Sequence, residues 1–315
     1  MLARSMKRTL SIVGAGRVGR TLGRRLRERG WRIGAVVTRS RATARAAVAA
    51  IGAGAPMIFS GSVGLYFRQR RLGGARALAL DLDAVFAADV IFLTTADDVL
   101  PAVARALARN AGFRCRGKII LHTAATLDRT ALAPFARLGA AVGSLHPMQA
   151  FGGEVMPNLG GVVFAIEGDP KARSMAQAIA KSLGGVPIVI ETRDKPIYHA
   201  AAVMAAGSLY PIIEAGTQML MRIGFSREQA MQTLVPLLRQ IFDNIERLGP
   251  REAWTGPLSR KDYAIVARHA RALRRYPREF QQAYAALALL AGRVLVRDHP
   301  AGELRKIAKA LDVKT

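Results

Sequence analysis

Cysteine is nearly absent from this sequence of 315 residues, and Cys115 is the single example. One thiol excludes a framework of disulfide bonds within the chain, and such sparing use of cysteine is typical of a reducing compartment. We expect Cys115 to be a small buried side chain and not a catalytic thiol. The sequence also lacks the spacing of cysteine and histidine that is typical of zinc sites, and we predict no bound metal.

Long apolar runs are also lacking. Residues 10–13 come after basic residues as in a signal peptide, but this apolar stretch is too short, and Arg17 adds a charge soon after it. We find no continuous apolar run of the roughly 20 residues that a membrane-spanning helix needs. With 51% hydrophobic and 22% charged residues, the chain has the composition of a globular protein. We therefore expect a cytoplasmic protein without a membrane segment.

Acidic residues are few compared with basic ones. The chain has 47 Lys and Arg against 22 Asp and Glu, which gives a net charge of +25. Such a charge could serve the binding of nucleic acid, an anionic membrane surface or small anionic ligands. The arginines are spread along most of the chain, and no basic strand is studded with the aromatic residues that bind RNA. We expect solvated arginine surfaces and do not favour a nucleic-acid partner, which stays as a third hypothesis.

A short apolar strand runs into a glycine-rich turn near the N-terminus. Residues 9–19 read TLSIVGAGRVG, and a helical pattern comes next. In this spacing Gly14 permits a tight turn, Gly16 lets a pyrophosphate approach the backbone, and Gly19 lets the helix pack closely on the strand. The phosphates would lie at the helix N-terminus, where free N–H groups and the helix dipole favour negative charge. The predicted dinucleotide site consists of Gly14, Ala15, Gly16, Arg17, Val18 and Gly19.

The end of the second predicted strand, residues 31–37, determines the choice of cofactor. Sites that prefer NAD usually place Asp or Glu here to bind the ribose hydroxyls, whereas this strand is followed by Thr38, Arg39 and Ser40. A guanidinium flanked by hydroxyls suits the 2′-phosphate of NADP, because it forms charge-assisted hydrogen bonds. We therefore predict NADP, with NAD as the less favoured cofactor and a solvated loop as the alternative role for Arg39.

Apolar strands alternate with helical patterns up to about residue 191. This alternation predicts an α/β fold, a Rossmann-type doubly wound sheet that is mostly parallel and has helices on both faces. From residue 192 onward the patterns are helical only, beginning with one long helix over residues 196–222. We therefore predict an NAD(P)-binding domain over residues 1–191 and an all-helical substrate and dimerisation domain over residues 192–315. The basic, glycine-rich stretch 61–77 is expected to be a surface loop without an assigned role.

Polar residues lie directly after three neighbouring strands of the predicted sheet. In an open parallel sheet, ligands bind beyond the carboxyl ends of the strands. These positions hold Thr94, Thr95, Asp97 and Asp98 after one strand, His122 and Thr123 after the next, and Ser144, His146 and Gln149 after the third. A single histidine at such a position is more often structural, but together these residues line the edge where a nicotinamide ring would lie. We therefore predict that Thr94, Thr95 and His122 contact the cofactor and that Gln149 contacts the substrate.

Two further groups of candidates fall in the predicted helical domain. Tyr198 and His199 lie at the start of its first long helix and are followed by small residues. The second group is Arg260, Lys261 and Asp262, where a polar loop runs into a helix. Lysine or arginine in this loop could bind a substrate carboxylate, and the alternatives are a solvated surface for the two cations and a helix cap for Asp262.

These stretches resemble one bacterial family that pairs a Rossmann-like domain with a helical domain of unknown function. The resemblance covers most of the chain from residue 10 to about residue 290, and its most specific stretches are SLHPMQ at 144–149 and TGPLSRKD at 255–262. More distantly, the chain is similar to pyrroline-5-carboxylate reductase and to the 6-phosphogluconate and 3-hydroxyacid dehydrogenases. The resemblance implies NAD(P) binding, a homodimer formed through the helical domain, and a substrate site between the domains.

Two positions depart from the pattern of this family. Ala124 and Ala125 stand where the family tends to have Ser-Gly, and Gly207 stands where an asparagine is expected. Our first hypothesis is an NADP-dependent oxidoreductase that transfers a hydride to or from a small carbonyl or imine substrate. Its catalytic residues would be His199 or His146 as proton donor and Lys261 as substrate anchor, with Tyr198, Arg260 and Asp262 as further substrate contacts. The alternative, which the two departures favour, is a catalytically inactive NADP-binding sensor or scaffold protein.

Overall fold

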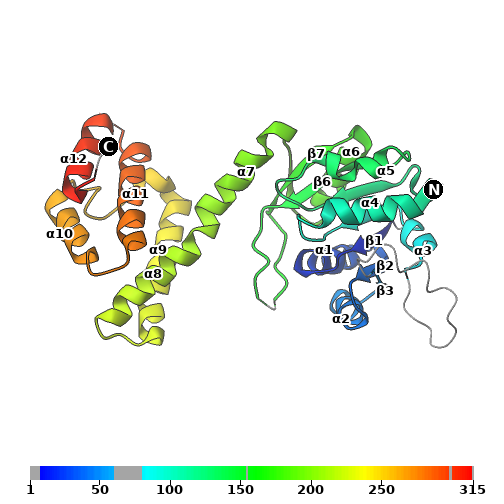
Figure 1. Ribbon diagram of the computed structural model, residues 1–315, viewed down its shortest axis with the longest axis horizontal. Coiled ribbons are helices and arrows are strands. Elements are labelled where there is room, and N and C mark those ends of the chain that lie inside the picture. Colours follow the sequence, from blue (N-terminus) through cyan, green and yellow to red (C-terminus); the bar gives the residue numbers. More distant parts are fainter. Residues whose placement is uncertain (1–7, 60–79, 154, 298–299, 314–315) are drawn as a thin grey trace. The chain divides into compact units, whose positions relative to one another are not determined.

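The computed structural model describes residues 8–59, 80–153, 155–297 and 300–313 (Figure 1). The chain divides into two compact units, Met1–Met204 and Ala205–Thr315, and each is described by itself. The division comes after Met204, although the helical pattern begins near Thr192, because the first turns of that helix form hydrogen bonds with the sheet. The basic stretch 61–77 lies outside the described residues.

The first unit is built on a sheet of eight strands within the described residues. The strand order is β3-β2-β1-β4-β5-β6-β7-β8, and all neighbours are parallel except β6 and β7, which are antiparallel. The predicted Rossmann-type, mostly parallel sheet is therefore confirmed. The strands are β1 (Thr9–Val13), β2 (Arg32–Thr38), β3 (Ala55–Ile58), β4 (Val90–Leu93), β5 (Ile119–His122), β6 (Ala141–Pro147), β7 (Val163–Gly168) and β8 (Val186–Val189).

Helices cover both faces of this sheet, as the doubly wound prediction requires. Leu22 of α1, Ile51 of α2 and Ile179 of α6 belong to the apolar core on one face, whereas α3, α4 and α5 supply the core on the other. Cys115 is fully buried in this second core, as predicted, and burial raises the pKa of its thiol. The helices are α1 (Arg17–Glu28), α2 (Arg41–Ile51), α3 (Leu82–Phe86), α4 (Leu100–Ala111), α5 (Ala133–Ala136) and α6 (Pro170–Ser182).

The second unit is helical throughout its described residues, which confirms the all-helical C-terminal region. The helices α8 (Leu209–Arg222) and α9 (Arg227–Glu252) pack against each other, and Ser226 begins α9 with a capping box. A small apolar core that includes Val266 and Ile307 is shared by the remaining helices. These are α10 (Tyr263–Leu273), α11 (Arg278–Val294) and α12 (Pro300–Leu311).

The long helix predicted over residues 196–222 is interrupted in the structure. It consists of α7 (Lys195–Ala202), a π-helical turn (Val203–Gly207) and α8. A π turn places an extra residue in the helix without changing its apolar composition, so the helical pattern alone did not indicate it. The predicted span is confirmed as one helical segment, and the π turn within it was not predicted.

This interrupted helix also bears on the expected lack of a membrane segment. Within the described residues, Thr192–Arg222 is the one helical segment long and apolar enough to cross a membrane by length and composition, and none of its qualifying window is buried. Tyrosine, histidine, serine and proline interrupt its apolar residues, so no continuous apolar run marks it in the sequence. A helix whose apolar face packs on another protein surface meets the same criterion, so length and composition alone do not assign a membrane segment.

Candidate functional site

The glycine-rich turn after β1 has the geometry that its spacing predicts. Gly14 has a φ of +89°, and a Cβ atom at this position would lie 2.5 Å from Cγ2 of Thr95. A Cβ atom on Gly19 would overlap Oγ1 of Thr94, whereas one on Gly16 would meet nothing closer than the Gly14 carbonyl oxygen at 3.8 Å. The backbone at Gly14 and the close contacts at Gly19 agree with the predicted tight turn and close packing, and Gly16 has the open surroundings that its predicted role needs.

The surroundings of this turn fit a phosphate-bearing ligand. Gly16 is the N-cap of α1 and offers no capping side chain, and the first turn of the helix contains no acidic residue. Unpaired N–H groups and the positive end of the helix dipole therefore face any group bound there. Oγ1 of Thr94 donates a hydrogen bond of 2.8 Å to the Gly14 carbonyl and so holds the turn. Oγ1 of Thr95 is buried without a hydrogen-bond partner among the described residues, so it can bond a polar ligand.

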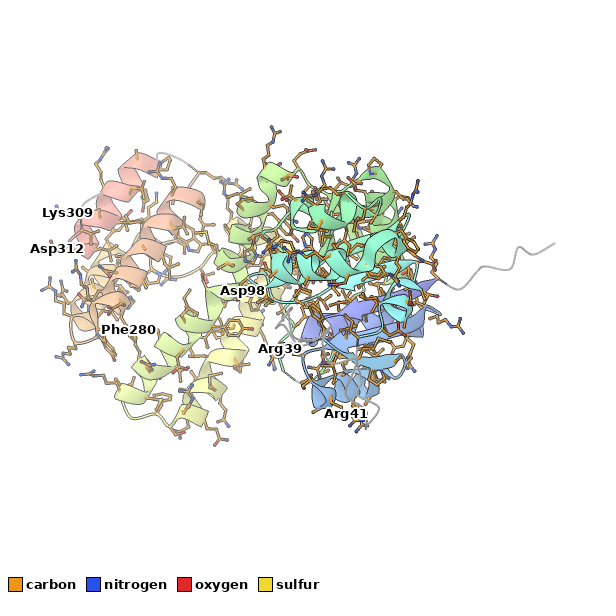
Figure 2. All side chains as sticks on the ribbon, turned by 45° about the vertical axis from the view of Figure 1, so that its right-hand side comes forward. Arg39, Arg41, Asp98, Phe280, Lys309 and Asp312 are labelled. Atoms are coloured by element: carbon orange, nitrogen blue, oxygen red, sulfur yellow. The ribbon has the colours of Figure 1, made fainter. Side chains whose placement is uncertain are left out.

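At the end of β2, Ser40 caps the next helix, and Arg39 is a cation that no other described residue binds. Ser40 is the N-cap of α2, and its Oγ accepts a 3.2 Å hydrogen bond from the backbone N–H of Thr43. The hydroxyl of Thr38 lies 2.7 Å from that of Thr43, so the predicted hydroxyl groups already have partners within the protein. Arg39 is exposed (Figure 2) and forms no hydrogen bond or ion pair with another described residue. Its guanidinium is therefore the group that remains available to an anion.

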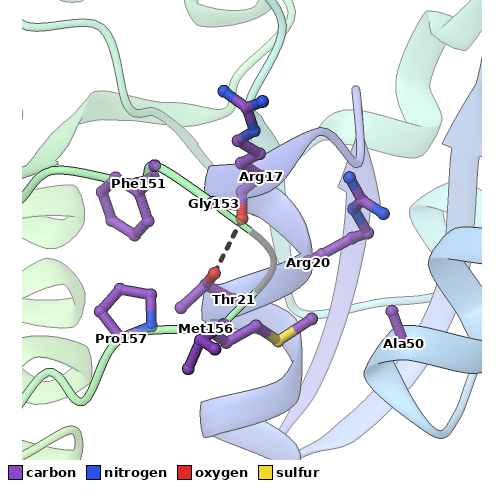
Figure 3. A pocket seen from close by; sticks show the side chains of 10 residues that line it. Arg17, Arg20, Thr21, Ala50, Phe151, Gly153, Met156 and Pro157 are labelled. Atoms are coloured by element: carbon purple, nitrogen blue, oxygen red, sulfur yellow. Dashed lines mark hydrogen bonds between the residues drawn. The ribbon is translucent and has the colours of Figure 1, made fainter. Parts of the chain in front are cut away.

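A cavity of about 350 Å³ lies beside the glycine turn on α1 (Figure 3). Arg17, Arg20 and Thr21 of α1 line it together with residues of the loop after β6. The backbone of Arg17, at the first position of the helix, is fixed by a 2.8 Å hydrogen bond from Oγ1 of Thr21. The cavity therefore places two guanidinium groups close to the predicted phosphate site, but it includes none of the polar residues that come after β4, β5 and β6.

A second group of polar side chains lies where β4 and β6 end and α7 begins. We define the sheet-edge cluster as Asp97, His146, Lys195, Tyr198 and His199. The hydroxyl of Tyr198 lies 3.0 Å from Nδ1 of His146, and the ring centroids of His146 and His199 are 6.5 Å apart. Nothing in the described part of the chain brings three His, Cys, Asp or Glu side chains together as a metal site. The structure thus brings together predicted catalytic and substrate residues from separate parts of the sequence.

Burial decides the charge of the paired ring and phenol in this cluster. Burial lowers the pKa of His146 to about 4, and the nearby charges of Lys195 and His199 act in the same direction. Burial raises the pKa of Tyr198 to about 12. Both groups are therefore uncharged near neutral pH. The prediction of His146 as proton donor assumed an imidazole that titrates near neutrality, so of the two histidines the geometry favours His199.

His199 combines an unused nitrogen with a neighbouring carboxylate. Its Nδ1 is buried without a hydrogen-bond partner among the described residues. Burial raises the pKa of Asp97, while the charge of His199, a hydrogen bond from Thr126 and the charge of Lys195 lower it. An imidazole nitrogen without a partner, next to a carboxyl group, is an arrangement suited to general acid–base chemistry.

Lys195 is the residue of this cluster that the sequence did not reveal. Only 1% of its surface is exposed, and its Nζ donates a 2.9 Å hydrogen bond to Oγ of Ser144. Burial lowers the pKa of its ammonium group, while Glu167, Asp128 and Asp97 oppose this effect. A usable signal was the spacing, because Lys195 lies three and four residues before Tyr198 and His199 and therefore on the same side of a helix.

His122 is fully buried, and both of its ring nitrogens bind backbone atoms. Nδ1 accepts a 3.2 Å hydrogen bond from the N–H of Ala124, and Nε2 lies 3.0 Å from the carbonyl oxygen of Asp128. Burial lowers the pKa of the ring to about 4, so it is uncharged near neutral pH. No ring nitrogen is left for the predicted cofactor contact, and we expect His122 to act through the loop 123–128 that it holds.

The remaining predicted substrate residues lie outside this cluster. Gln149 is exposed after the end of β6. Asp262 is the N-cap of α10 and accepts a 3.2 Å hydrogen bond from the N–H of Ile265, which is the alternative considered for it. Arg260 and Lys261 are exposed in the second unit, where Lys261 has a left-handed backbone with a φ of +59°. Their proposed contacts with a substrate stay predictions.

Comparison with protein families assigns part of the chain. Residues 162–291 match DUF2520, a family described as a domain of unknown function. This match covers less than half of the chain. The DUF2520 segment begins before β7 and ends within α11, so it includes Lys195, Tyr198 and His199 but not the glycine turn. A search of curated proteins finds no match.

Solved structures with the same fold cover nearly all of the chain. Protein BF3122 from Bacteroides fragilis shares 19% identity, with 90% of this chain and 96% of that chain covered and a TM-score of 0.68. A reductive aminase from Aspergillus terreus, solved with NADPH and ethyl-5-oxohexanoate, shares 17%, with 94% and 98% covered and a TM-score of 0.63. Pyrroline carboxylate reductase from Plasmodium falciparum, solved with NADP, shares 12%, with 96% and 98% covered and a TM-score of 0.53. At these identities the likeness shows the fold, and it confirms the predicted similarity to pyrroline-5-carboxylate reductases at that level.

The two buried histidines predict how stability depends on pH. His122 and His146 have a pKa of about 4 in the folded chain against 6.5 for an ordinary histidine, so the unfolded chain binds more protons between these values. The free energy of unfolding should therefore fall as the pH falls below 6.5, by about 2 kcal/mol for each histidine between pH 7 and pH 5. Urea unfolding at a series of pH values measures this loss.

His146→Gln should remove about half of this dependence on pH, since one of the two histidines then no longer titrates. His269→Gln, which changes an imidazole on α10 that is bonded to the hydroxyl of Tyr284, should keep all of it. A free energy of unfolding that stays constant or rises between pH 7 and pH 5 would contradict the assignment.

Proposed function

We propose that the protein is an NADP-dependent oxidoreductase that transfers a hydride between the cofactor and a small carbonyl or imine substrate. The observation that carries this proposal is the buried, unpartnered Nδ1 of His199 in a cluster beyond the strands that come after the glycine turn. A nucleotide site and a group able to exchange a proton thus lie on one sheet. The shared fold with a reductive aminase solved with NADPH supports the proposal.

Several features of the first unit would hold the cofactor. The backbone N–H groups at the start of α1 and the open approach at Gly16 suit the diphosphate, and the free hydroxyl of Thr95 can bond a polar group of the cofactor. The exposed guanidinium of Arg39 suits the 2′-phosphate. When bound, the cofactor would supply or accept the hydride.

The sheet-edge cluster would handle the proton that accompanies the hydride. A proton on Nδ1 of His199 has no acceptor among the described residues, so it is available to a substrate atom that gains negative charge. Asp97 interacts electrostatically with this ring. The phenol of Tyr198 remains protonated up to about pH 12 and can orient the substrate by hydrogen bonding.

The second candidate function, a sensor or scaffold that binds NADP without turnover, draws on Gly207 and on Ala124 and Ala125. Gly207 lacks the side-chain amide of the asparagine expected at this position, and it lies in the π-helical turn. Ala124 and Ala125 are buried, and Ala124 uses its backbone N–H to bind His122. Ala124 and Ala125 therefore have a structural role in the loop after β5. Gly207 is the stronger argument for an inactive protein.

We also propose that two copies associate through the helical unit. Leu237, Ile241, Ile245 and Leu248 of α9 are exposed and have helical spacing, so they form one apolar face. Further apolar side chains of α8 and α9 are exposed as well, namely Tyr210, Ile212, Met221 and Phe242. An apolar surface of this extent favours association with another surface, and a second copy would cover it in a cytoplasmic protein.

Replacing His199 tests the enzymatic proposal. His199→Gln removes the proposed proton donor but keeps a polar side chain, so kcat should fall about 100-fold or more while NADPH affinity stays within twofold. Absorbance of NADPH with a panel of imines and 2-oxoacids measures turnover, and calorimetry measures affinity. His269→Gln, in the second unit, is the matched control and should keep full activity. Unchanged turnover in His199→Gln would remove this residue from the mechanism.

The same assay separates the enzyme from the sensor. Tight NADPH binding without oxidation by any substrate in the panel would support the sensor or scaffold. Absence of both NADPH and NADH binding at millimolar concentration would overturn both proposals.

Replacing Arg39 tests the choice of cofactor. Arg39→Ala removes the guanidinium that suits the 2′-phosphate, so NADPH affinity should fall about tenfold or more while NADH affinity hardly changes. Calorimetric titration with both cofactors measures the difference. Arg45→Ala, which removes an exposed arginine from the helix α2 that follows Arg39, is the control and should change neither affinity. Equal losses for both cofactors would contradict the role of Arg39.

A charge among the exposed apolar side chains of α9 tests the dimer. Phe242 is 52% exposed, and Phe242→Asp would place a carboxylate where a second copy packs, so dimer affinity should fall at least about tenfold. Sedimentation velocity over a range of concentrations measures it. Lys309→Asp adds the same carboxylate on α12 and should leave association unchanged. A wild-type chain that sediments as a monomer at every concentration would overturn the proposal.

A further inference from the structure

The ammonium group of Lys195 is enclosed within the first unit. Only 1% of the residue is exposed, and Nζ donates its 2.9 Å hydrogen bond to a serine hydroxyl of the neighbouring strand β6. A lysine is rarely buried to this degree without a charged or functional reason, because removing an ammonium group from water is costly. The proposed proton transfer does not yet use this group.

The serine that Lys195 binds, Ser144, lies on β6 two residues before His146. Ser144 and His146 are two residues apart on the same strand, so their side chains emerge on the same face of the sheet. Ser144 is also paired with His122 of β5 on one side and with Glu167 of β7 on the other. The ammonium group of Lys195 is therefore held on the same side of β6 as His146, whose ring contacts Tyr198.

The charges around this ammonium group come from every element next to it. Glu167 is 5% exposed and accepts a 2.8 Å hydrogen bond from the backbone N–H of Arg129, so a buried carboxylate offsets the lysine. The groups that interact electrostatically with Lys195 are Glu167 of β7, Asp128 after β5, Asp97 after β4, His122 of β5 and His146 of β6. His146 itself also faces His199 and the phenol of Tyr198 on α7. Burial is the main cause that keeps the ring of His146 uncharged, and the charge of Lys195 adds more to this effect than that of His199.

We propose that Lys195 is a positioning residue: its buried charge adds to the effect of burial in keeping the ring of His146 neutral, with the ring hydrogen on Nε2, so that the Tyr198 hydroxyl donates its hydrogen to Nδ1 of that ring. With Nδ1 as acceptor, the 3.0 Å contact has one direction, and the oxygen of Tyr198 turns its lone pairs toward the substrate. The proton for the substrate then comes from His199. A protonated His146 would instead donate to the phenol oxygen and reverse this arrangement. The role in catalysis rests on the proposed oxidoreductase function, whereas the effect on the ring of His146 does not.

The protonation of His146 can be followed directly in the full chain without cofactor. The chain has five histidines, so ¹³C-labelled histidine gives few NMR signals, and His146→Gln identifies the one from His146. In Lys195→Met the pKa of His146 should rise by about one unit, because an adjacent positive charge is removed. Lys195→Arg keeps the charge and should keep the pKa of His146 within about 0.3 units of the wild-type value.

Two further variants separate charge from packing and from folding. Ser144→Ala removes the hydrogen-bond acceptor but keeps the ammonium group, so the pKa of His146 should stay near that of the wild type. The double variant Lys195→Met with Glu167→Gln removes both buried charges, so it gives a folded sample if the single variant unfolds, and its His146 pKa should also rise. Lys171→Met, which removes an exposed lysine bonded to the Gly117 carbonyl, is the matched control and should change nothing.

A pKa of His146 that is the same in the wild type and in the folded Lys195→Met variants would overturn the proposal. A raised pKa in Lys195→Met that Lys195→Arg restores supports it. If the protein turns over substrate, the acidic limb of its pH–rate profile should move in parallel with that pKa, and an unmoved limb would overturn the positioning role. If no substrate is turned over, the NMR result still decides the effect on His146, and only the proposed function fails.

Discussion

The attachment of α7 to the sheet is the constraint on which the candidate site depends. Lys195 bonds Ser144 at 2.9 Å, and Tyr198 bonds His146 at 3.0 Å, so the first turn of this helix is tied to one strand at two points. Without these two bonds the helix would have no polar contact with β6, and the rings of His146 and His199 would not face each other at 6.5 Å. The geometry of the site thus results from a lysine and a tyrosine that reach inward from a helix whose outer side is exposed.

The cost of this attachment is the burial of charge. An ammonium group inside the fold is tolerated because Glu167, itself nearly buried, lies on the neighbouring strand and because a hydroxyl accepts one of its hydrogens. Removing either charged partner alone would leave the other uncompensated. The same charges act on the histidines nearby, so the bonds that anchor the helix also influence which groups of the site carry a proton.

The fold was predictable because its signals are local. The turn at residues 14–19 requires glycine at three positions, and the surroundings of each glycine differ. The strand β1 is apolar on both faces because helices cover both sides of the sheet. Lys195 and the π-helical turn at Val203–Gly207 were not predictable in this way. The burial of Lys195 depends on Ser144 and Glu167, which are distant in sequence, and the π turn leaves no trace in the helical pattern of small and apolar residues. The charge of His146 likewise depends on burial and not on its position after a strand.

The single reversal of direction in the sheet explains why the helix and the strand can be matched at all. Because β7 and β8 run opposite to β6, the chain leaves β8 near the level of Ser144 and Leu145, and α7 then rises in the same direction as β6. Three residues of helix advance about 4.5 Å and two residues of strand about 6.6 Å, so the two spans differ by about 2 Å, and the side chains of Lys195 and Tyr198 still reach Ser144 and His146. One extra residue between Lys195 and Tyr198 would turn the phenol by about 100° around the helix axis. The length of that first helical turn is therefore as much a part of the site as any functional group in it.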